Sequence, residues 1–154
     1  MPLTHQVAGV TEVKWNNIQL GFSRDGVTIR TQPYYEDIHS DDFGGASAPP
    51  ADSQFMGAIA LVTAELTKWN EVEVNKLGKF GGAGSRGTVA VIGSLVRAGG
   101  LFGSLFLDNA GDPRTYARAF LRQAQEVNVG TKYSTFIVGW ECWIDTTGSR
   151  ILFS

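Results

Sequence analysis

The clearest alternation of hydrophobic and polar positions runs from Tyr133 to Asp145. Because successive side chains of a β-strand point to opposite faces, this period of two predicts a half-buried antiparallel strand. One face carries the apolar side chains Phe136, Val138, Trp140, Cys142 and Ile144, and the other includes Thr135, Gly139, Glu141 and Asp145. A turn at 146–149 and a terminal strand at Arg150–Phe153 are expected to follow.

A β-hairpin is predicted near the N-terminus. Asp25-Gly26 is typical of a type I′ turn, which needs positive φ at both central residues. It lies between Asn17–Arg24 and Val27–Tyr34, which carry the apolar residues Ile18, Leu20, Phe22, Val27 and Ile29. We expect these two runs to pair. The β-type pattern starts at Glu12, and residues 1–11 are aperiodic, so we interpret them as an extended arm.

The run Phe55–Leu66 is apolar on both of its alternating faces. It therefore indicates a strand buried on both sides, although a helix fits the same periodicity. Thr67–Leu77 is predicted to be the one helix of the chain. Its spacing places Trp69, Val72, Leu77 and Phe80 near one face, with Asn70 and Glu73 as a capping box and Gly78 as the stop.

A second hairpin is expected around Gly99-Gly100, between Thr88–Arg97 and Leu101–Leu107. The stretch that follows, Pro113–Val129, is ambiguous. Asp112 as N-cap and Pro113 in the first turn favour a helix, whereas the end of the stretch favours a strand. The residues alone leave this choice open.

About seven or eight strands with one flanking helix indicate a mainly β chain, folded as an antiparallel β-sandwich or barrel. A length of 154 residues fits one domain spanning 1–154. No internal repeat or interdomain linker is visible.

The segment 36–54 has a different composition from the runs on either side of it. It is rich in Gly, Ala, Ser and Pro, and it contains the acids Glu36, Asp37, Asp41, Asp42 and Asp52. Such a segment cannot bury enough apolar area to form a core of its own. Connections of this length are uncommon in a compact domain unless they are functional or disordered. We therefore expect a long extended loop that engages a neighbouring copy of the chain.

Charge and cysteine content narrow the classes of function. The net charge is −2, which gives no overall attraction to nucleic acid or anionic lipid. The single cysteine excludes a disulfide framework within the chain and a Cys-rich metal site. The N-terminus lacks the pattern of a signal peptide, and no apolar run is long enough to span a bilayer. We expect a protein without membrane insertion that stays inside the cell or in a particle assembled there.

The sequence contains no recognisable catalytic set, so we predict no enzyme activity, cofactor or metal site. Its two histidines, His5 and His39, lie in the arm and in the long loop. Gly82–Gly87 matches G-x-G-x-x-G, but a predicted helix precedes these glycines, whereas a dinucleotide site needs a strand there. Cys142, on the apolar face of its strand, is expected to be a buried small hydrophobe.

Arg114, Arg118 and Arg122 recur every four residues, which places them on one side of either a helix or a strand. On a strand this face would also carry Tyr116 and Phe120, and it could bind a single nucleic-acid strand by stacking and charge. The alternative is a basic edge that pairs with an acidic surface. The overall acidic balance favours the alternative.

Taken in order, these elements resemble the tail tube protein family of bacteriophages, whose fold is shared with the type VI secretion tube protein. The resemblance covers most of the chain and rests on order and spacing. The segments that carry it are Leu20-Gly21 before Asp25-Gly26, the long Gly/Ala/Pro loop, the Gly57–Leu66 run, the Trp69–Leu77 helix, the turn at Gly99-Gly100, and Val127-Asn128-Val129-Gly130-Thr131.

The resemblance implies a structural virion protein that forms hexameric rings. In that family, sheets join around the ring into a continuous barrel, and rings stack through a long loop into a hollow conduit for DNA delivery. It also implies a strand at Thr115–Val129, and we adopt that interpretation. Sheath, baseplate or initiator, and tail-terminator proteins are the implied partners, and DNA passes through without specific binding. A head decoration or tail-terminator role and a nucleic-acid-binding barrel are the alternatives.

The candidate contact residues between subunits or rings lie in the long loop: Asp37, Ile38, His39, Asp41, Asp42, Phe43, Gly44, Gly45, Pro49 and Pro50. Ile38 and Phe43 supply apolar anchors, and the acids would set orientation. Arg114, Arg118 and Arg122 form a second candidate, as a charged interface or lumen face. The expected location is the virion, after assembly in the host cytoplasm.

Overall fold

The computed structural model describes residues 10–24, 26–69, 91–98, 100–109, 111–122, 126–127, 136–145 and 150–154. Several expectations fall outside these residues. They are the N-terminal extension at 1–9, Asp25 of the predicted turn, most of the predicted helix, the glycine motif at 82–87, residues 128–131 of the segment that resembles the tail tube family, and the turn at 146–149.

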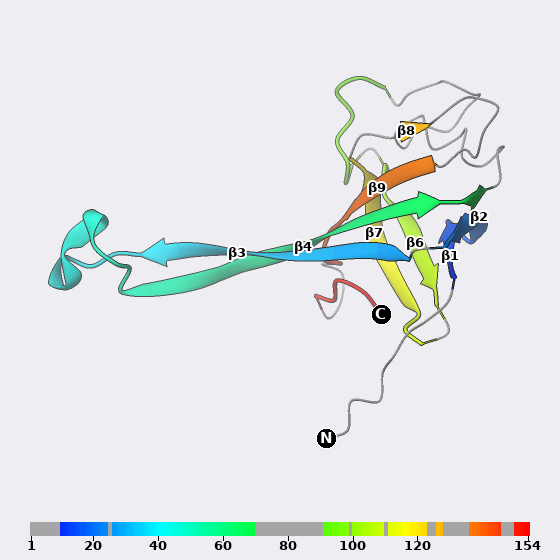
Figure 1. Cartoon of the computed structure of the whole chain (residues 1–154). Helices are drawn as coiled ribbons and strands as arrows, with labels where there is room; N and C mark the ends of the chain where they lie inside the picture. The colour runs from blue at the N-terminus through cyan, green and yellow to red at the C-terminus, as the bar shows by residue number, and fades with distance from the viewer. Residues whose placement is uncertain are drawn as a thin grey trace.

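Nine strands of the described residues form one antiparallel sheet (Figure 1). The strands are β1 Thr11–Trp15, β2 Ile18–Ser23, β3 Val27–Ile38, β4 Asp52–Leu66, β5 Lys68–Trp69, β6 Gly103–Asp108, β7 Arg114–Leu121, β8 Glu126–Val127 and β9 Phe136–Cys142. Eight of them follow the order β3-β4-β9-β7-β6-β1-β2-β5, and β8 pairs with β9. The expectation of a mainly β, antiparallel chain is confirmed.

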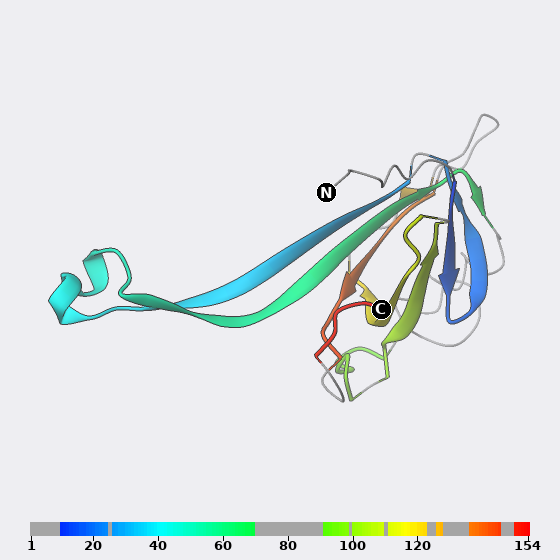
Figure 2. The same cartoon turned by 90° about the horizontal axis from the view of Figure 1, so that it is seen from below.

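The sheet is curled but not closed (Figure 2). Its two ends approach each other where β4 bends into β5, since the Thr67 N–H donates to the Phe22 carbonyl at 3.0 Å. No ladder joins β3 to β2, so the sheet built by the described residues has two edges. The structure therefore does not confirm the expected sandwich or barrel.

The face that lines the inside of the curl, here called the inner face, carries the core. Its buried side chains come from most of the strands and include Val13, Leu20, Val62, Leu105, Tyr116, Phe136 and Trp140. The predicted strand within Tyr133–Asp145 is confirmed as β9, and its alternating apolar residues Phe136, Val138, Trp140 and Cys142 are all buried. Gly139 and Glu141 on the outer face are buried as well, because β9 lies between β4 and β7.

The hairpin predicted at Asp25-Gly26 is wrong. Both flanking strands exist, but β2 pairs with β1 and β5, whereas β3 pairs with β4. The chain changes from one end of the sheet to the other at this point. A two-residue turn signal reports only the local reversal of the backbone, and the pairing is decided by longer-range contacts.

The long loop predicted at 36–54 is shorter than expected. The β3–β4 ladder continues to Ile38 opposite Asp52, so only 39–51 connect the two strands. The predicted strand at Phe55–Leu66 is confirmed within β4, but its burial on both sides is wrong. Residues 52–56 are exposed, and only Ala60, Val62, Ala64 and Leu66 are fully buried.

The helix predicted to start at Thr67 is wrong where the structure describes it, because Lys68–Trp69 is strand β5. Residues 70–77 lie outside the described residues. The described residues contain only two 3₁₀ turns, Asp41–Phe43 and Gly45–Ser47. Neither is long and apolar enough to cross a membrane. Pairing with Gly21-Phe22 of β2 explains why Trp69 packs against the core as part of a strand.

Two further expectations are corrected. The second hairpin is not formed as predicted, because 91–98 is a series of turns and β6 pairs with β1 and β7. Arg150–Phe153 is irregular rather than a strand, although Ser154 and Thr115 exchange two backbone hydrogen bonds.

The ambiguous stretch after Pro113 is strand β7 up to Leu121, as the family resemblance implied. Its position between β6 and β9 overrides the local helical signals.

Candidate functional site

The β3–β4 ribbon projects from the body of the molecule as a long arm (Figure 1). Its tip, residues 39–51, is closed by a hydrogen bond from the Ala51 N–H to the Ile38 carbonyl at 2.8 Å. Two 3₁₀ turns fill the tip, with Gly44 between them at φ 98° and Gly45 at φ 74°. Those dihedrals favour glycine, so the glycines of the tip shape a compact connection.

The arm carries large apolar side chains that the chain itself leaves exposed. They are Tyr34, Tyr35, Ile38, Phe55 and Met56, each between 43% and 61% exposed. Tyr35 and Phe55 lie opposite each other on the ribbon, and their rings meet edge to face at 5.5 Å. Exposed large apolar side chains grouped on one ribbon make it a candidate interaction site.

A β-bulge separates the root of the arm from its outer part. Tyr34 pairs with Gly57 and Tyr35 with Phe55, so Met56 is the extra residue of β4. Gly57 has φ +132°, a conformation that L side chains rarely adopt. Bulges increase the local twist of a ribbon and redirect its side chains. Here the bulge lets Tyr34 and Met56 line one pocket although they belong to different strands.

The arm concentrates negative charge. Residues 36–54 contain five carboxylates and no Lys or Arg, which gives −5, and the remaining residues together carry +3, the difference between −2 and −5. The carboxylates are spread along the ribbon and the tip, and one of them, Asp37, accepts a hydrogen bond from Ser53 Oγ at 2.9 Å. Within the described ranges no three His, Cys, Asp or Glu side chains are placed to hold a metal ion.

The structure places the candidate contact residues in two settings. Asp37 and Ile38 end strand β3, and this part of the loop prediction is corrected. The others, His39, Asp41, Asp42, Phe43, Gly44, Gly45, Pro49 and Pro50, belong to the tip. Ser40 is the N-cap of the first 3₁₀ turn, because its Oγ accepts a hydrogen bond from the Asp42 N–H at 3.4 Å.

The outer edge of β3 is a second feature of the arm. β3 ends the strand order and has 12 residues, so none of the described strands lies beside its backbone groups on that side. Long free edges are sites of pairing with another chain. Pro33, in the middle of β3, has no N–H and interrupts the row of donors along this edge.

Sequence reasoning missed the free edge and the apolar root of the arm. Tyr34, Phe55 and Met56 looked like ordinary strand residues of a core. One signal for a longer ribbon was present in the sequence. Polar residues lie where the two apolar runs face the loop, Glu36-Asp37 on one side and Ser53-Gln54 on the other, and these residues continue β3 and β4 as a pair.

The three arginines do not share one face as predicted. β7 contains an irregularity opposite β6: Tyr116 pairs with Leu105, but Ala119 pairs with Gly103. This extra residue shifts the alternation, so Arg114 lies on the inner side with Tyr116, while Arg118 and Arg122 lie with outer-face residues. The continuous cation–aromatic face required for the single-strand nucleic-acid interpretation is not formed.

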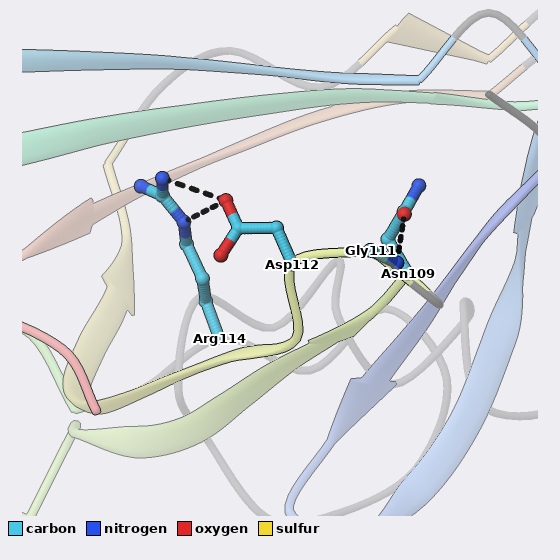
Figure 3. A network of polar contacts seen from close by, with 4 residues as sticks. All are labelled: Asn109, Gly111, Asp112 and Arg114. Atoms are coloured by element: carbon cyan, nitrogen blue, oxygen red, sulfur yellow. Dashed lines mark hydrogen bonds and ion pairs between the residues drawn. The ribbon is translucent and has the colours of Figure 1, made fainter. Parts of the chain in front are cut away.

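Arg114 belongs to a polar network in the connection between β6 and β7 (Figure 3). Its Nε and Nη2 both donate to Asp112 Oδ2, at 2.9 and 2.8 Å, and its guanidinium lies 4.5 Å from the centre of the Phe153 ring. Hydrogen bonding to Asp112 raises the pKa of Arg114 above its ordinary value. Nearby, Asn109 accepts from the Gly111 N–H at 3.0 Å. These bonds fix the turn before β7.

On the outer face, two arginines and three aromatic rings form what we call the outer cluster: Arg97, Arg118, Phe102, Phe120 and Trp143. The three rings meet edge to face, with centroids 4.9 to 5.9 Å apart. Arg97 lies over Phe102 and Trp143, at 5.5 and 5.6 Å, and Arg118 lies over Phe102 and 3.8 Å from Asp145. Cation–π contacts of this kind hold the guanidinium groups against the protein surface.

Beside the outer cluster lies an ion pair between the exposed Arg122 and the buried Glu141. Arg122 Nη1 contacts Glu141 Oε2 at 2.8 Å, and Trp143 Nε1 donates to the same oxygen at 3.3 Å. The Glu141 side chain is only 8% exposed. The charge-assisted hydrogen bond raises the pKa of Arg122 above its ordinary value. The partners compensate the burial of this carboxylate.

Cys142 is fully buried, as expected. Burial raises the pKa of its thiol to about 12. Since the thiolate is the nucleophilic form of cysteine, a thiol in this position stays protonated and unreactive at neutral pH.

No protein-family model matches this chain, and no curated protein sequence matches it.

Proposed function

We propose that the chain is the subunit of a bacteriophage tail tube, which forms hexameric rings that stack into a hollow conduit for DNA delivery. The observation that carries the proposal is the β3–β4 arm. It exposes Tyr35, Ile38 and Phe55 and carries an acidic tip, and the other described residues leave these parts uncovered. In the tail tube family that the sequence resembles, a long loop between early strands joins one ring to the next.

The free edge of β3 supports the ring itself. An antiparallel sheet with open ends can be extended by a strand of a neighbouring copy, which satisfies the unpaired backbone groups of the edge. A head-to-tail contact of this kind closes into a ring when its rotation permits, and stacking of rings then makes an open tube. In this proposal the curled sheets of six copies join into the barrel that a single chain does not close.

Location and partners follow from the same proposal. The tube belongs to the virion and is assembled in the host cytoplasm, with an initiator at one end and a terminator at the other. Sheath proteins surround it in contractile tails. DNA passes through the lumen without base-specific contacts, which agrees with a chain of net charge −2.

Electron microscopy and sedimentation of the purified chain test the proposal. Rings or tubes of even diameter support it. A strictly monomeric chain that binds oligonucleotides with a steep salt dependence would overturn it in favour of a nucleic-acid-binding protein. Single rings that never stack would point to a head decoration or tail-terminator role.

A further inference from the structure

A pocket of about 220 Å³ lies at the end of the sheet where β5 pairs with β2, and we call it the β2–β5 pocket. Its lining includes Gln19, Leu20, Gly21, Phe22, Lys68 and Trp69. Leucine, phenylalanine and tryptophan supply apolar surface, and the lysine supplies an ammonium group. An apolar cavity of about 150 Å³ already holds a benzene-sized group, so this pocket has room for one apolar side chain.

The pocket is shaped by the close approach of β5 to β2. Trp69 pairs with Gly21 and packs against the core. A Cβ added at Gly21 would collide with the backbone of Lys68 and Trp69, so a larger residue there would push the two strands apart. The Thr67 N–H donates to the Phe22 carbonyl at 3.0 Å. These contacts hold Lys68 opposite Phe22.

The ammonium group of Lys68 lies at an edge of the sheet. β5 ends the strand order, and Lys68 is exposed. None of the described carboxylates forms an ion pair with it. Glu12, which lies opposite Phe22 on β1, contacts Lys14 instead, at 3.7 Å. The β2–β5 pocket can therefore accept an apolar side chain that has a carboxylate beside it.

The arm presents such a combination. Ile38 is 46% exposed, and its cross-strand partner is Asp52. Glu36 lies two residues before Ile38 and therefore on the same face of the ribbon. One face of the arm thus offers an aliphatic side chain between two carboxylates, whereas Asp37 points to the opposite face.

Ile38 cannot reach the β2–β5 pocket of its own chain. Its cross-strand partner Asp52 begins β4, and Lys68 follows the other end of that strand. β4 has 15 residues and therefore spans roughly 50 Å. The β3–β4 ladder runs along the ribbon from Ile38 to Val27, so the ribbon cannot fold back on the body. An arm that fills this pocket must belong to a second copy.

Charge complementarity favours the same occupant. The segment 36–54 carries −5 and the rest of the chain carries +3, so the arm of one copy is attracted to the body of another. We propose that the β2–β5 pocket receives Ile38 of a second copy, with Glu36 and Asp52 of that copy beside Lys68. This inference rests on the proposed function and names the surface to which the arm binds.

The contact is heterologous, because donor and acceptor lie at opposite ends of one ribbon. Each bound copy presents its own arm in turn, so the contact repeats without a built-in limit. The advance from one copy to the next cannot exceed the distance between the two ends, which is roughly 50 Å. In a tube, this length is the upper limit for the spacing between stacked rings.

Charge-exchange variants of the full chain test this inference, with self-association followed by sedimentation velocity. We expect Ile38→Ser, Glu36→Lys and Lys68→Glu each to weaken self-association by about tenfold or more. The double variant Glu36→Lys/Lys68→Glu should recover most of the loss, because the charges are exchanged. Asp37→Lys, on the other face of the arm, should lose much less than Glu36→Lys. Arg30→Glu reverses an exposed charge on β3 and should have little effect.

Disulfide trapping identifies the contact directly. An Ile38→Cys chain mixed with a Gln19→Cys chain should be cross-linked into dimers by diamide, because the two positions meet in the proposed contact. With Asp37→Cys in place of Ile38→Cys, cross-linking should be about tenfold slower, since the side chain points away. The native thiol of Cys142 is buried and does not take part. Thermal unfolding checks that each variant is folded, and Lys68→Gln replaces Lys68→Glu if the latter does not fold.

Each outcome has a distinct meaning. Tubes formed equally well by the parent chain and by Lys68→Glu, without cross-linking between positions 38 and 19, would overturn the β2–β5 pocket as acceptor and leave the proposed function standing. Cross-linked open chains without rings would support the acceptor and overturn the tube. Binding of an oligonucleotide that depends on Lys68, without self-association, would overturn the inference and identify the pocket as a nucleic-acid site.

Discussion

The indole rings of Trp15 and Trp140 stack with centroids 6.1 Å apart and an interplanar angle of 26°. Trp15 lies on β1 and Trp140 on β9, and the strands β6 and β7 lie between them in the sheet. In a flat sheet β1 and β9 would be about 14 Å apart, three times the usual spacing between neighbouring strands. The stacked pair therefore requires the sheet to curl over its own inner face.

Gly103 makes room for this pair. A Cβ added at Gly103 would lie against the Trp15 ring. We expect Gly103→Ala to displace Trp15 and lower the free energy of unfolding by about 1–3 kcal/mol, the usual cost of overpacking a core. Chemical denaturation measures the loss, and near-ultraviolet circular dichroism reports the disturbed indole pair. Ser104→Ala, at the next position, is the control and should be nearly neutral. Equal stability of Gly103→Ala and the parent chain would contradict this account of the curl.

The buried carboxylate of Glu141 predicts an asymmetric response to mutation. Arg122→Ala removes its cation and leaves the charge on Glu141 with only Trp143 Nε1 as a donor from this group of side chains. We expect a midpoint of thermal unfolding that is a few degrees lower. In a Glu141→Gln background the same substitution should have much less effect, because no buried charge remains. Equal effects in both backgrounds would show that the ion pair is not coupled.

The thiol of Cys142 predicts a pH dependence of stability. Its pKa is about 12 in the folded chain and 9.0 for the exposed group, so the unfolded chain releases this proton first as the pH rises. Stability from this group is therefore complete below pH 9.0 and declines up to about pH 12. Between pH 9 and pH 10.5 the free energy of unfolding should fall by about 2 kcal/mol more in the parent chain than in Cys142→Ala.

Denaturation curves of the two proteins at several pH values measure this difference. Burial also raises the pKa of Tyr116, and the electrostatic coupling of Tyr116 to Cys142 is part of the difference between the two proteins. Parallel pH profiles would show that Cys142 is accessible to solvent.

Pro33 predicts a change in association through the free edge of β3. Proline fits within a strand where its nitrogen faces an unpaired side, so Pro33→Val should add a donor to the row along that edge. We expect more, and less regular, self-association, measured by light scattering and electron microscopy. Pro49→Val, in the tip, is the control and should leave the scattering unchanged. A Pro33→Val variant that assembles like the parent chain would argue against pairing along this edge.

Side-chain alternation was sufficient to predict β9 and the antiparallel class, because a strand with one face on the core must bury every second residue. The acidic composition of 36–54 likewise indicated a segment outside the core. Which strands pair with each other could not be predicted from the sequence in the same way. Asp25-Gly26 is a local turn signal in the sequence, yet β2 and β3 belong to opposite ends of the sheet, and only long-range contacts decide that.

The arginine face shows a second limit. The spacing of Arg114, Arg118 and Arg122 is regular in sequence, but a single extra residue in β7 places Arg114 on the other side of the sheet. Bulges have no reliable signature in one sequence, so an argument from period two fails beyond them. The pocket lined by Tyr34, Met56 and Trp143 could not be predicted for a related reason, since it joins the ribbon to segments that are distant in the sequence.

Electron microscopy of the parent chain beside a variant that lacks Asp41–Pro50 tests the central claim most directly. The deletion removes both 3₁₀ turns but keeps the ribbon up to Ile38 and Asp52, so the body should stay folded with an unchanged unfolding transition. We predict tubes of even diameter for the parent chain and no long tubes for the variant. Long tubes formed by the variant, or a parent chain that remains monomeric, would contradict the assembly role of the arm.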